Sequence, residues 1–366
     1  MNLHDLDTPS LVVDLDRLER NVKAMSDLVR PYGVRLRPHV KTHKTVEIAR
    51  LQMKYGAAGL TVAKIGEAEV MAEAGFDDLL IANIVIGKAK LERLARLVRT
   101  VRIKSCVDSL EGAAMMSEMA VRYGVVFDVM LDVNSGLNRT GILPEQAILL
   151  GKEVAKLPGL RLCGVFTYGG YGPPVKDDGL RNQWARREAE TAVFVARELE
   201  NAGIAAAEVS VAGTPTSRFG AAVAGVTEVR PGTYVFNDAN YVRLGFGTFD
   251  DCALRIRARV ISRPAADRAV IDAGSKVLTS EKPVRDGQDV GYGHIVGLPD
   301  SKIAALWEEH GVVHLCDEGR QLKIGDVIEI IPNHVCPAVN LADCLYGVRG
   351  DKVEGIFAVA ARGKVQ

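Results

Sequence analysis

The first two-thirds of the chain alternates short apolar runs with longer amphipathic stretches, and this alternation restricts the fold more than any other feature. The short runs, rich in Val, Ile and Leu, are typical of buried strands, and the stretches between them have helical spacing. About eight strand–helix units fit before residue 245, which predicts a parallel (β/α)8 barrel. An open doubly wound sheet needs the same elements and is the alternative. The clearest strands are expected at residues 34–40, 59–62, 79–82, 103–107, 127–132, 162–166 and 208–211.

Beyond about residue 248 the pattern changes to short strands separated by turns. Residues 253–261 and 327–331 are strand-like, and Asp286–Gly287 and Gly325–Asp326 are turn dipeptides. Helical spacing is limited to a few residues near 301–309. The α/β barrel is therefore expected to be followed by a mostly antiparallel β domain.

The composition excludes several classes of partner. Lys+Arg and Asp+Glu both number 46, so the formal net charge is zero and there is no electrostatic case for nucleic-acid or anionic-membrane binding. No apolar run reaches the roughly 18–20 residues that span a bilayer. The opening residues 1–7 are acidic where a signal peptide needs a basic and then an apolar stretch, and the six cysteines are scattered without a CxxC pair. We expect reduced thiols and a cytoplasmic enzyme.

A dense group of cations lies where the first barrel strand should end. Two lysines and two histidines fall within six residues, His39 to Lys44. Side chains at the C-terminal ends of barrel strands face the active site, so this position favours a lysine directed into the barrel mouth. A desolvated lysine there can form a Schiff base, and Lys41 is the candidate. Read alone, the segment is equally typical of a solvated basic loop.

Two loops rich in Gly and Thr follow late strands. They are Gly213-Thr214-Pro215-Thr216 and Arg230-Pro231-Gly232-Thr233-Tyr234. Barrels often bind phosphate on such loops, because backbone N–H groups and hydroxyls can surround the anion. Each loop alone is also ordinary turn chemistry. Their place opposite an early-strand lysine strengthens the prediction of an anion site.

The β domain contains one distinctive motif, residues 331–337, in which His334 and Cys336 stand two positions apart. On an extended segment the two side chains point to the same side, and both are good ligands for a metal such as zinc. Two ligands are too few for a structural site but suit an open one. A buried His beside a structural Cys is the alternative. His314 and Cys316 repeat the spacing inside an apparent strand, where we prefer the structural interpretation.

Taken together and in order, these motifs resemble the D-threonine aldolase / D-serine dehydratase family. That family has the alanine-racemase-like fold of enzymes that use pyridoxal 5′-phosphate (PLP). The resemblance covers essentially the whole chain and implies a PLP-binding barrel over residues 14–245. The β domain over residues 246–366, joined by residues 1–13, would carry the metal pair. It also implies a homodimer, a small D-amino-acid substrate, and PLP with a divalent metal (Zn, Mn or Mg) as cofactors.

The resemblance also implies a role for individual residues. Lys41 corresponds to the Schiff-base lysine, with Lys44 as its neighbour, and His334 and Cys336 correspond to the metal ligands. Tyr168 lies where related enzymes place an aromatic ring or a histidine against the pyridine ring, and is a second catalytic candidate. The remaining expected cofactor contacts are His39, Arg139, Gly213, Thr214, Gly232, Thr233 and Tyr234.

Two features depart from the family pattern. Many members carry a histidine in the loop after the position of Tyr168, whereas residues 169–174 here contain none. The His-x-Cys pair resembles the dehydratase branch, since typical aldolases pair His with Asp. The ending at residues 345–364 looks more like the aldolases, so the branch stays open.

The function implied is a PLP- and metal-dependent lyase acting on D-amino acids with a β-hydroxyl. The leading expectation is retro-aldol cleavage of D-threonine-like substrates to glycine and an aldehyde. A D-serine-type dehydratase, giving a 2-oxo acid and ammonia, is the alternative. An amino-acid racemase of the same fold is more remote because it needs no metal. A non-catalytic PLP-binding protein is disfavoured by the second domain.

Overall fold

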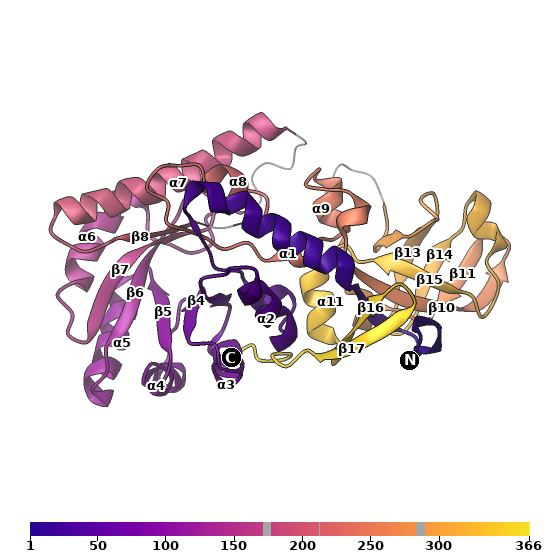
Figure 1. The fold of residues 1–366 in the computed structure, drawn as a ribbon, viewed down its shortest axis with the longest axis horizontal. Helices are drawn as coiled ribbons and strands as arrows, with labels where there is room; N and C mark the ends of the chain where they lie inside the picture. The colour runs from indigo at the N-terminus through magenta and orange to yellow at the C-terminus, as the bar shows by residue number, and fades with distance from the viewer. Residues whose placement is uncertain (171–176, 212, 283–289) are drawn as a thin grey trace.

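The computed structural model describes residues 1–170, 177–211, 213–282 and 290–366. Its strands form two sheets, one of eight and one of nine strands, which lie at opposite ends of an elongated molecule (Figure 1). The turn expected at Asp286–Gly287 lies outside the described residues. Within the described ranges, no helix combines the length and apolar character needed to cross a bilayer.

The eight-stranded sheet has the order β2-β9-β8-β7-β6-β5-β4-β3, and every pair in it is parallel. A parallel bridge between His39 and Thr61 joins its two ends, and the Thr61 N–H donates to the Pro38 carbonyl at 2.8 Å. The strand order never reverses, so the barrel is confirmed and the doubly wound sheet is excluded. The strands are β2 (Arg35–Leu36), β3 (Leu60–Val62), β4 (Asp78–Ile81), β5 (Arg102–Val107), β6 (Phe127–Val133), β7 (Leu160–Thr167), β8 (Glu208–Val211) and β9 (Glu228–Val229).

Helices cover the barrel, and their ends carry ordinary capping signals. The Asp14 carboxylate accepts from the first backbone N–H groups of α1, and Ser109 caps α5 in the same way. Gly124 ends α5 in the left-handed conformation that glycine adopts without strain. The helices are α1 (Leu15–Val29), α2 (Val46–Lys54), α3 (Ile65–Glu73), α4 (Lys88–Leu97), α5 (Leu110–Tyr123), α6 (Pro144–Val154), α7 (Asp178–Asn201), α8 (Ser217–Gly220) and α9 (Ala239–Arg243).

The second sheet is mostly antiparallel, as expected. The N-terminal strand β1 (Ser10–Asp14) lies in it, antiparallel to β10 and parallel to β16. The two domain ranges given above stay a prediction. The other elements are β10 (Leu254–Ala265), β11 (Arg268–Ile271), α10 (Ser275–Leu278), β12 (His294–Ile295), β13 (Lys302–Leu306), β14 (Gly311–His314), β15 (Val327–Ile331), α11 (Val335–Leu341), β16 (Cys344–Arg349) and β17 (Lys352–Ala358).

The helix expected near residues 301–309 is wrong. Residues Lys302–Leu306 form strand β13, which pairs antiparallel with β14. Ile303 is fully buried while its neighbours are partly exposed. Pairing within the sheet thus overrides the helical preference of the Ala-Ala-Leu run.

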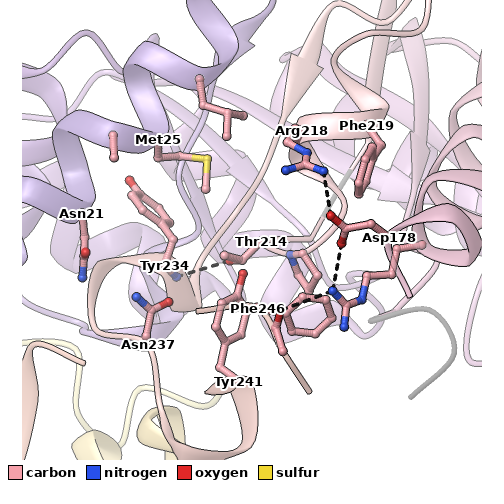
Figure 2. A pocket seen from close by; sticks show the side chains of 15 residues that line it. Asn21, Met25, Asp178, Thr214, Arg218, Phe219, Tyr234, Asn237, Tyr241 and Phe246 are labelled. Carbon is pink, nitrogen blue, oxygen red and sulfur yellow. Dashed lines mark hydrogen bonds and ion pairs between the residues drawn. The ribbon is translucent and has the colours of Figure 1, made fainter. Parts of the chain in front are cut away.

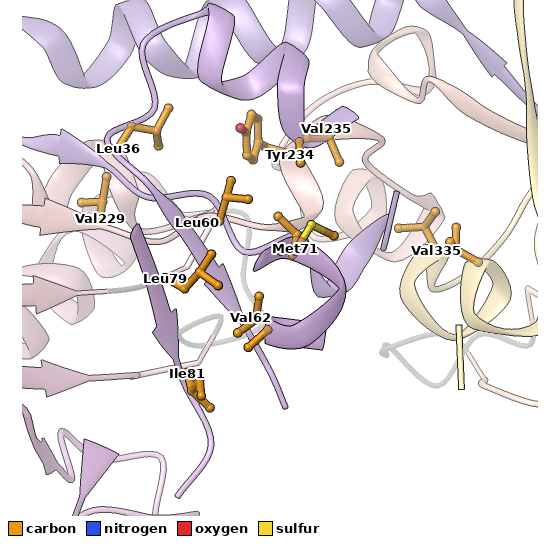
Figure 3. Packing of buried hydrophobic residues seen from close by; sticks show 14 of the residues in the cluster. Leu36, Leu60, Val62, Met71, Leu79, Ile81, Val229, Tyr234, Val235 and Val335 are labelled. Atoms are coloured by element: carbon orange, nitrogen blue, oxygen red, sulfur yellow. The ribbon is translucent and has the colours of Figure 1, made fainter. Parts of the chain in front are cut away.

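One apolar cluster runs from the barrel into the β domain. Leu60 and Val62 of β3 belong to it, and so does Val335 at the start of α11. Figure 3 shows Val335 approaching the barrel side chains from the β-domain side. This packing fixes α11, and the residues that precede it, against the mouth of the barrel.

Candidate active site

A cavity of about 350 Å³ opens where the C-terminal ends of the barrel strands meet the β domain. The structure brings most of the predicted residues together in its wall, although their individual roles stay predictions. Tyr234 is the exception among the candidates. The lining residues are His39, Lys41, Ala63, Ala82, Asn83, Arg139, Phe166, Tyr168, Gly213, Thr214, Arg230, Gly232, Thr233, His334 and Cys336.

Lys41 lies in the 3-10 helix η3 (Val40–Thr42), which follows the first barrel strand. We expected a desolvated lysine, but the Lys41 side chain is exposed and forms part of the cavity wall. No described residue forms a hydrogen bond or ion pair with its amine. Lys44, three positions on, is buried, and its Nζ lies 3.0 Å from the Glu67 carboxylate and 2.8 Å from the Asn340 amide oxygen. Only the first of these two lysines is therefore available for chemistry.

His39 joins the lysine turn to the second Gly/Thr loop. Its backbone N–H donates to the Pro231 carbonyl at 2.8 Å, and its Nδ1 accepts from the Lys41 N–H at 3.5 Å. Burial lowers the pKa of His39 well below its usual value, and the nearby charge of Lys41 lowers it further. The imidazole is therefore neutral at physiological pH.

The two Gly/Thr loops have little space for larger side chains. A Cβ on Gly213, whose φ is +106°, would lie 2.6 Å from Thr216 Oγ1. A Cβ on Gly232 would lie 3.1 Å from Thr42 Oγ1 and 3.2 Å from the His39 carbonyl. Thr214 Oγ1 ties the loops together, since it accepts from the backbone N–H of Gly232 at 3.1 Å. The loops thus form one tight corner of the cavity beside the lysine turn.

Tyr234 does not share the cavity of Lys41. It follows Thr233 in the 3-10 helix η4 (Thr233–Val235), and its ring lines a separate open cavity of about 310 Å³, which we call the outer cavity. Figure 2 shows this ring beside Asn21 and Asn237, with the Tyr234 backbone reaching Thr214. Its backbone, and not its side chain, therefore contacts the Gly/Thr loops.

Arg139 and Tyr168 face each other across the cavity wall. The Arg139 guanidinium carbon lies 4.8 Å from the centre of the Tyr168 ring, within the range of a cation–π contact. Burial raises the pKa of the Tyr168 hydroxyl, and Arg139 partly opposes this. Residues 169 and 170, which follow Tyr168, contain no histidine, and residues 171–174 of the same loop lie outside the described residues.

Arg230 is the main residue that the sequence interpretation left out of the site. It is 3% exposed, and its guanidinium carbon lies 3.7 Å from the centre of the Phe166 ring. It donates to Ser210 Oγ at 2.5 Å and to the Thr167 carbonyl. Burial lowers the pKa of this guanidinium. The sequence signal that could have identified Arg230 is its position as a cation at the end of β9, directly before Pro231-Gly232.

The metal pair reaches the cavity from the β domain. We expected an extended segment, but only His334 is extended: it occupies the N-cap position of α11 without a side-chain capping bond, and Cys336 lies in the first turn of the helix. The two side chains nevertheless line the cavity together. Cys336 Sγ lies 3.3 Å from the hydroxyl of Thr42, the residue after Lys41. His314 and Cys316 lie at the far end of β14 and do not line this cavity.

His334 is held by a carboxylate far away in the sequence. Its Nδ1 lies 2.6 Å from Glu281 Oε2, which leaves Nε2 as the nitrogen free to face Cys336. Burial opposes both charges, but the interaction with Cys336 raises the pKa of His334 to about 9. The same interaction lowers the pKa of the Cys336 thiol. The lowered pKa favours the thiolate, which is the form in which a cysteine binds a metal.

The loop before His334 is fixed by polar contacts. The Asn333 side-chain amide donates to the Glu281 carbonyl at 3.1 Å and accepts from Arg243 at 2.5 Å. The Val335 N–H donates to the Asp238 carboxylate at 3.2 Å. In the described part of the chain, no cluster of three or more His, Cys, Asp or Glu residues has metal-binding geometry. The described residues therefore offer His334 and Cys336 as two candidate ligands.

Family models match both parts of the chain. The model for the N-terminal domain of alanine racemase matches residues 13–240, and the model for a putative serine dehydratase domain matches residues 253–348. With the fold and the lysine-bearing cavity, they define an alanine-racemase-like PLP enzyme.

The full-length relatives narrow this class. D-threonine aldolase of Arthrobacter sp is 35% identical over 364 residues, or 98% of this chain and 93% of the relative. The crystal structure of D-threonine aldolase from Filomicrobium marinum has a TM-score of 0.92 and 37% identity, and the alignment covers 100% of this chain and 98% of that one. D-threo-3-hydroxyaspartate dehydratase from Delftia sp. HT23 has a TM-score of 0.91 and 31% identity, with 98% of both chains covered. The chain belongs to the D-threonine aldolase / D-serine dehydratase family, as the resemblance predicted, and is a PLP-dependent lyase.

Proposed function

We propose that this protein is a PLP- and divalent-metal-dependent lyase that cleaves D-β-hydroxy-amino acids, with retro-aldol cleavage of D-threonine-like substrates as its main reaction. The observation that carries the proposal is that Lys41 and the His334–Cys336 pair line the same cavity. The cytoplasmic location and the homodimer expected from the sequence are part of this proposal.

The residues present fit PLP. Lys41 supplies an amine without a partner among the described residues, and the glycine corner at Gly213 and Gly232 excludes side chains where a phosphate needs close approach to the backbone. Arg230 adds a buried cation, which an anionic or ring-nitrogen group of a ligand can pair with. A cavity of about 350 Å³ accommodates a small cofactor together with an amino acid.

The residues also fit a divalent metal. Imidazole and thiolate are the ligand types that zinc and other borderline metals prefer. Two solved variants of a D-threo-3-hydroxyaspartate dehydratase support the assignment: one replaces a cysteine and is in the metal-free form, and another replaces a histidine two positions earlier. That spacing is the spacing of His334 and Cys336.

Different side chains of this protein would bind the cofactor and the metal. Bound PLP acts as an electron sink for charge that develops at the substrate Cα. Lys41 would hold the cofactor, and its amine would be placed to hold or move a proton at the substrate Cα. His334 and Cys336 would hold a divalent metal, which would supply Lewis-acid chemistry for the substrate β-hydroxyl. Neutral His39 and buried Arg230 would orient the ring without adding a mobile proton.

A dehydratase reaction, giving a 2-oxo acid and ammonia, is the second candidate. The His-x-Cys pair favours it, because the histidine and cysteine replaced in the D-threo-3-hydroxyaspartate dehydratase variants have the same two-position spacing. The higher identities of the D-threonine aldolases, 35% and 37%, favour the aldol route. A racemase is disfavoured by the metal pair.

Product analysis separates these functions. Purified holoenzyme is incubated with D-threonine and with D-serine, each with and without added Mn²⁺ or Zn²⁺. We expect glycine and acetaldehyde from D-threonine, with activity that is lost on chelation and restored by the metal. Pyruvate and ammonia from D-serine as the dominant products would establish the dehydratase instead. Metal-independent interconversion of enantiomers would refute both.

A further inference from the structure

A chain of buried polar side chains runs behind the lysine turn. The His43 Nδ1 accepts from the Thr45 N–H at 3.2 Å, and its Nε2 lies 3.2 Å from Gln52 Oε1. The Gln52 amide nitrogen donates to the Tyr234 hydroxyl at 3.0 Å. His43, Gln52 and Tyr234 are at most 3% exposed, so this chain is shielded from water. Groups buried so deeply are costly to leave unpaired, and every link is made.

The hydrogen bonds along these side chains all run in one direction, because the first bond fixes which atoms donate and accept in the others. A backbone N–H can only donate, so His43 Nδ1 is an acceptor and the proton is on Nε2. That proton is donated to Gln52 Oε1, and the Gln52 amide then donates to Tyr234. Burial lowers the pKa of His43 to about 4, so the imidazole keeps this neutral form.

Both ends of the chain meet segments that bind the cofactor in the proposed function. At one end, the His43 N–H donates to the Val40 carbonyl at 3.1 Å and closes the η3 turn that carries Lys41. At the other end, the Tyr234 N–H donates to Thr214 Oγ1 at 3.3 Å, the atom that also ties down Gly232 (Figure 2).

The Tyr234 ring packs in the apolar cluster with Leu36 and Leu60 (Figure 3). None of these contacts enters the cavity of Lys41, whose lining does not include His43, Gln52 or Tyr234. The chain therefore acts on that cavity from behind its wall.

We propose that His43, Gln52 and Tyr234 are positioning residues that hold the Lys41 turn at a fixed distance from the two Gly/Thr loops. The inference rests on the proposed function, in which one rigid cofactor contacts the lysine and the loops at the same time. A ligand held at two points binds tightly only where both points are already in place, so a flexible wall weakens it.

The test uses Gln52→Leu, which breaks both links of Gln52, and Tyr234→Phe, which breaks the link to Gln52 alone. Neither residue lines the cavity of Lys41. Ser117→Ala is the matched control. Ser117 is a buried residue of α5, and the substitution removes the hydrogen bond that its hydroxyl donates to the Pro158 carbonyl. For each protein we would measure the thermal midpoint, the Kd of the apoprotein for PLP, and the pH dependence of the visible band of the lysine-linked cofactor.

We expect Tyr234→Phe, which loses one buried hydrogen bond, to bind PLP about tenfold more weakly and Gln52→Leu to bind it at least as weakly, and we expect both to shift the titration of the band. The double variant should be no weaker than the worse single one, because both substitutions break the same chain. Ser117→Ala should lower only the midpoint. If the Gln52 and Tyr234 variants lower the thermal midpoint but keep the parent Kd and the parent titration of the visible band, these hydrogen bonds contribute to stability alone and the proposal is overturned. A parent protein without saturable PLP binding would instead refute the proposed function.

Discussion

The barrel half of the cavity contains Lys41, Arg230 and the two Gly/Thr loops. These residues lie together because the C-terminal ends of parallel strands meet at one edge of the sheet. In the β-domain half, which holds His334 and Cys336, positions follow from the docking of α11 against the barrel. The segments of the first half are joined by backbone hydrogen bonds, such as the bond from the His39 N–H to the Pro231 carbonyl. The second depends on side-chain contacts between distant segments, such as Glu281 with His334. The difference suggests that cofactor binding and metal binding can be lost separately.

The largest expected effect tests the barrel half. Lys41→Ala should remove the visible absorption of the lysine-linked cofactor and lower turnover by on the order of 10⁴-fold or more, because no other described lysine lines the cavity. Absorption spectra and steady-state kinetics measure both quantities. Lys44→Met is the control, and its band should persist since Lys44 is bonded to Glu67 and Asn340. A band that survives in Lys41→Ala would mean that the lysine is misassigned.

The next effect is a loss of folding stability at acidic pH. Burial lowers the pKa of His43 to about 4, so below pH 6.5 the unfolded chain binds more protons than the folded one. Stability contributed by neutral His43 is complete above pH 6.5 and falls as the pH drops towards 4, by about 3 kcal/mol over this window. Urea unfolding of the parent and of His43→Gln across the range measures it. Equal pH slopes for the two proteins would contradict the buried neutral histidine.

The smallest effect tests the β-domain half. Glu281→Gln should weaken metal binding by about 10- to 100-fold, because a carboxylate on the second imidazole nitrogen orients a histidine ligand and increases its basicity. Chelator competition measures the metal affinity, and the visible band should stay as in the parent. Glu309→Gln, at an exposed pair with Lys276, is the control and should change neither. An unchanged metal affinity in Glu281→Gln would remove Glu281 from the account.

The same contrast explains what could be predicted from sequence. The strand-end rule located Lys41 and both Gly/Thr loops, because parallel strands place their ends at one edge. It could not place the Tyr234 ring, since the η4 turn rotates the side chain away from Gly232 and into the apolar cluster. The contact between Glu281 and His334 spans 53 residues and has no local signal. Helical spacing near residues 301–309 misled because sheet pairing decides the conformation of β13.

The central claim is that the two halves of one cavity hold different groups, PLP in the barrel half and the metal in the β-domain half. Cys336→Ala tests it most directly, with metal content and visible cofactor absorption measured on the same purified sample. The account predicts that bound metal and turnover are lost while the cofactor band remains at the parent intensity. Loss of both metal and band, or full retention of metal, would contradict it.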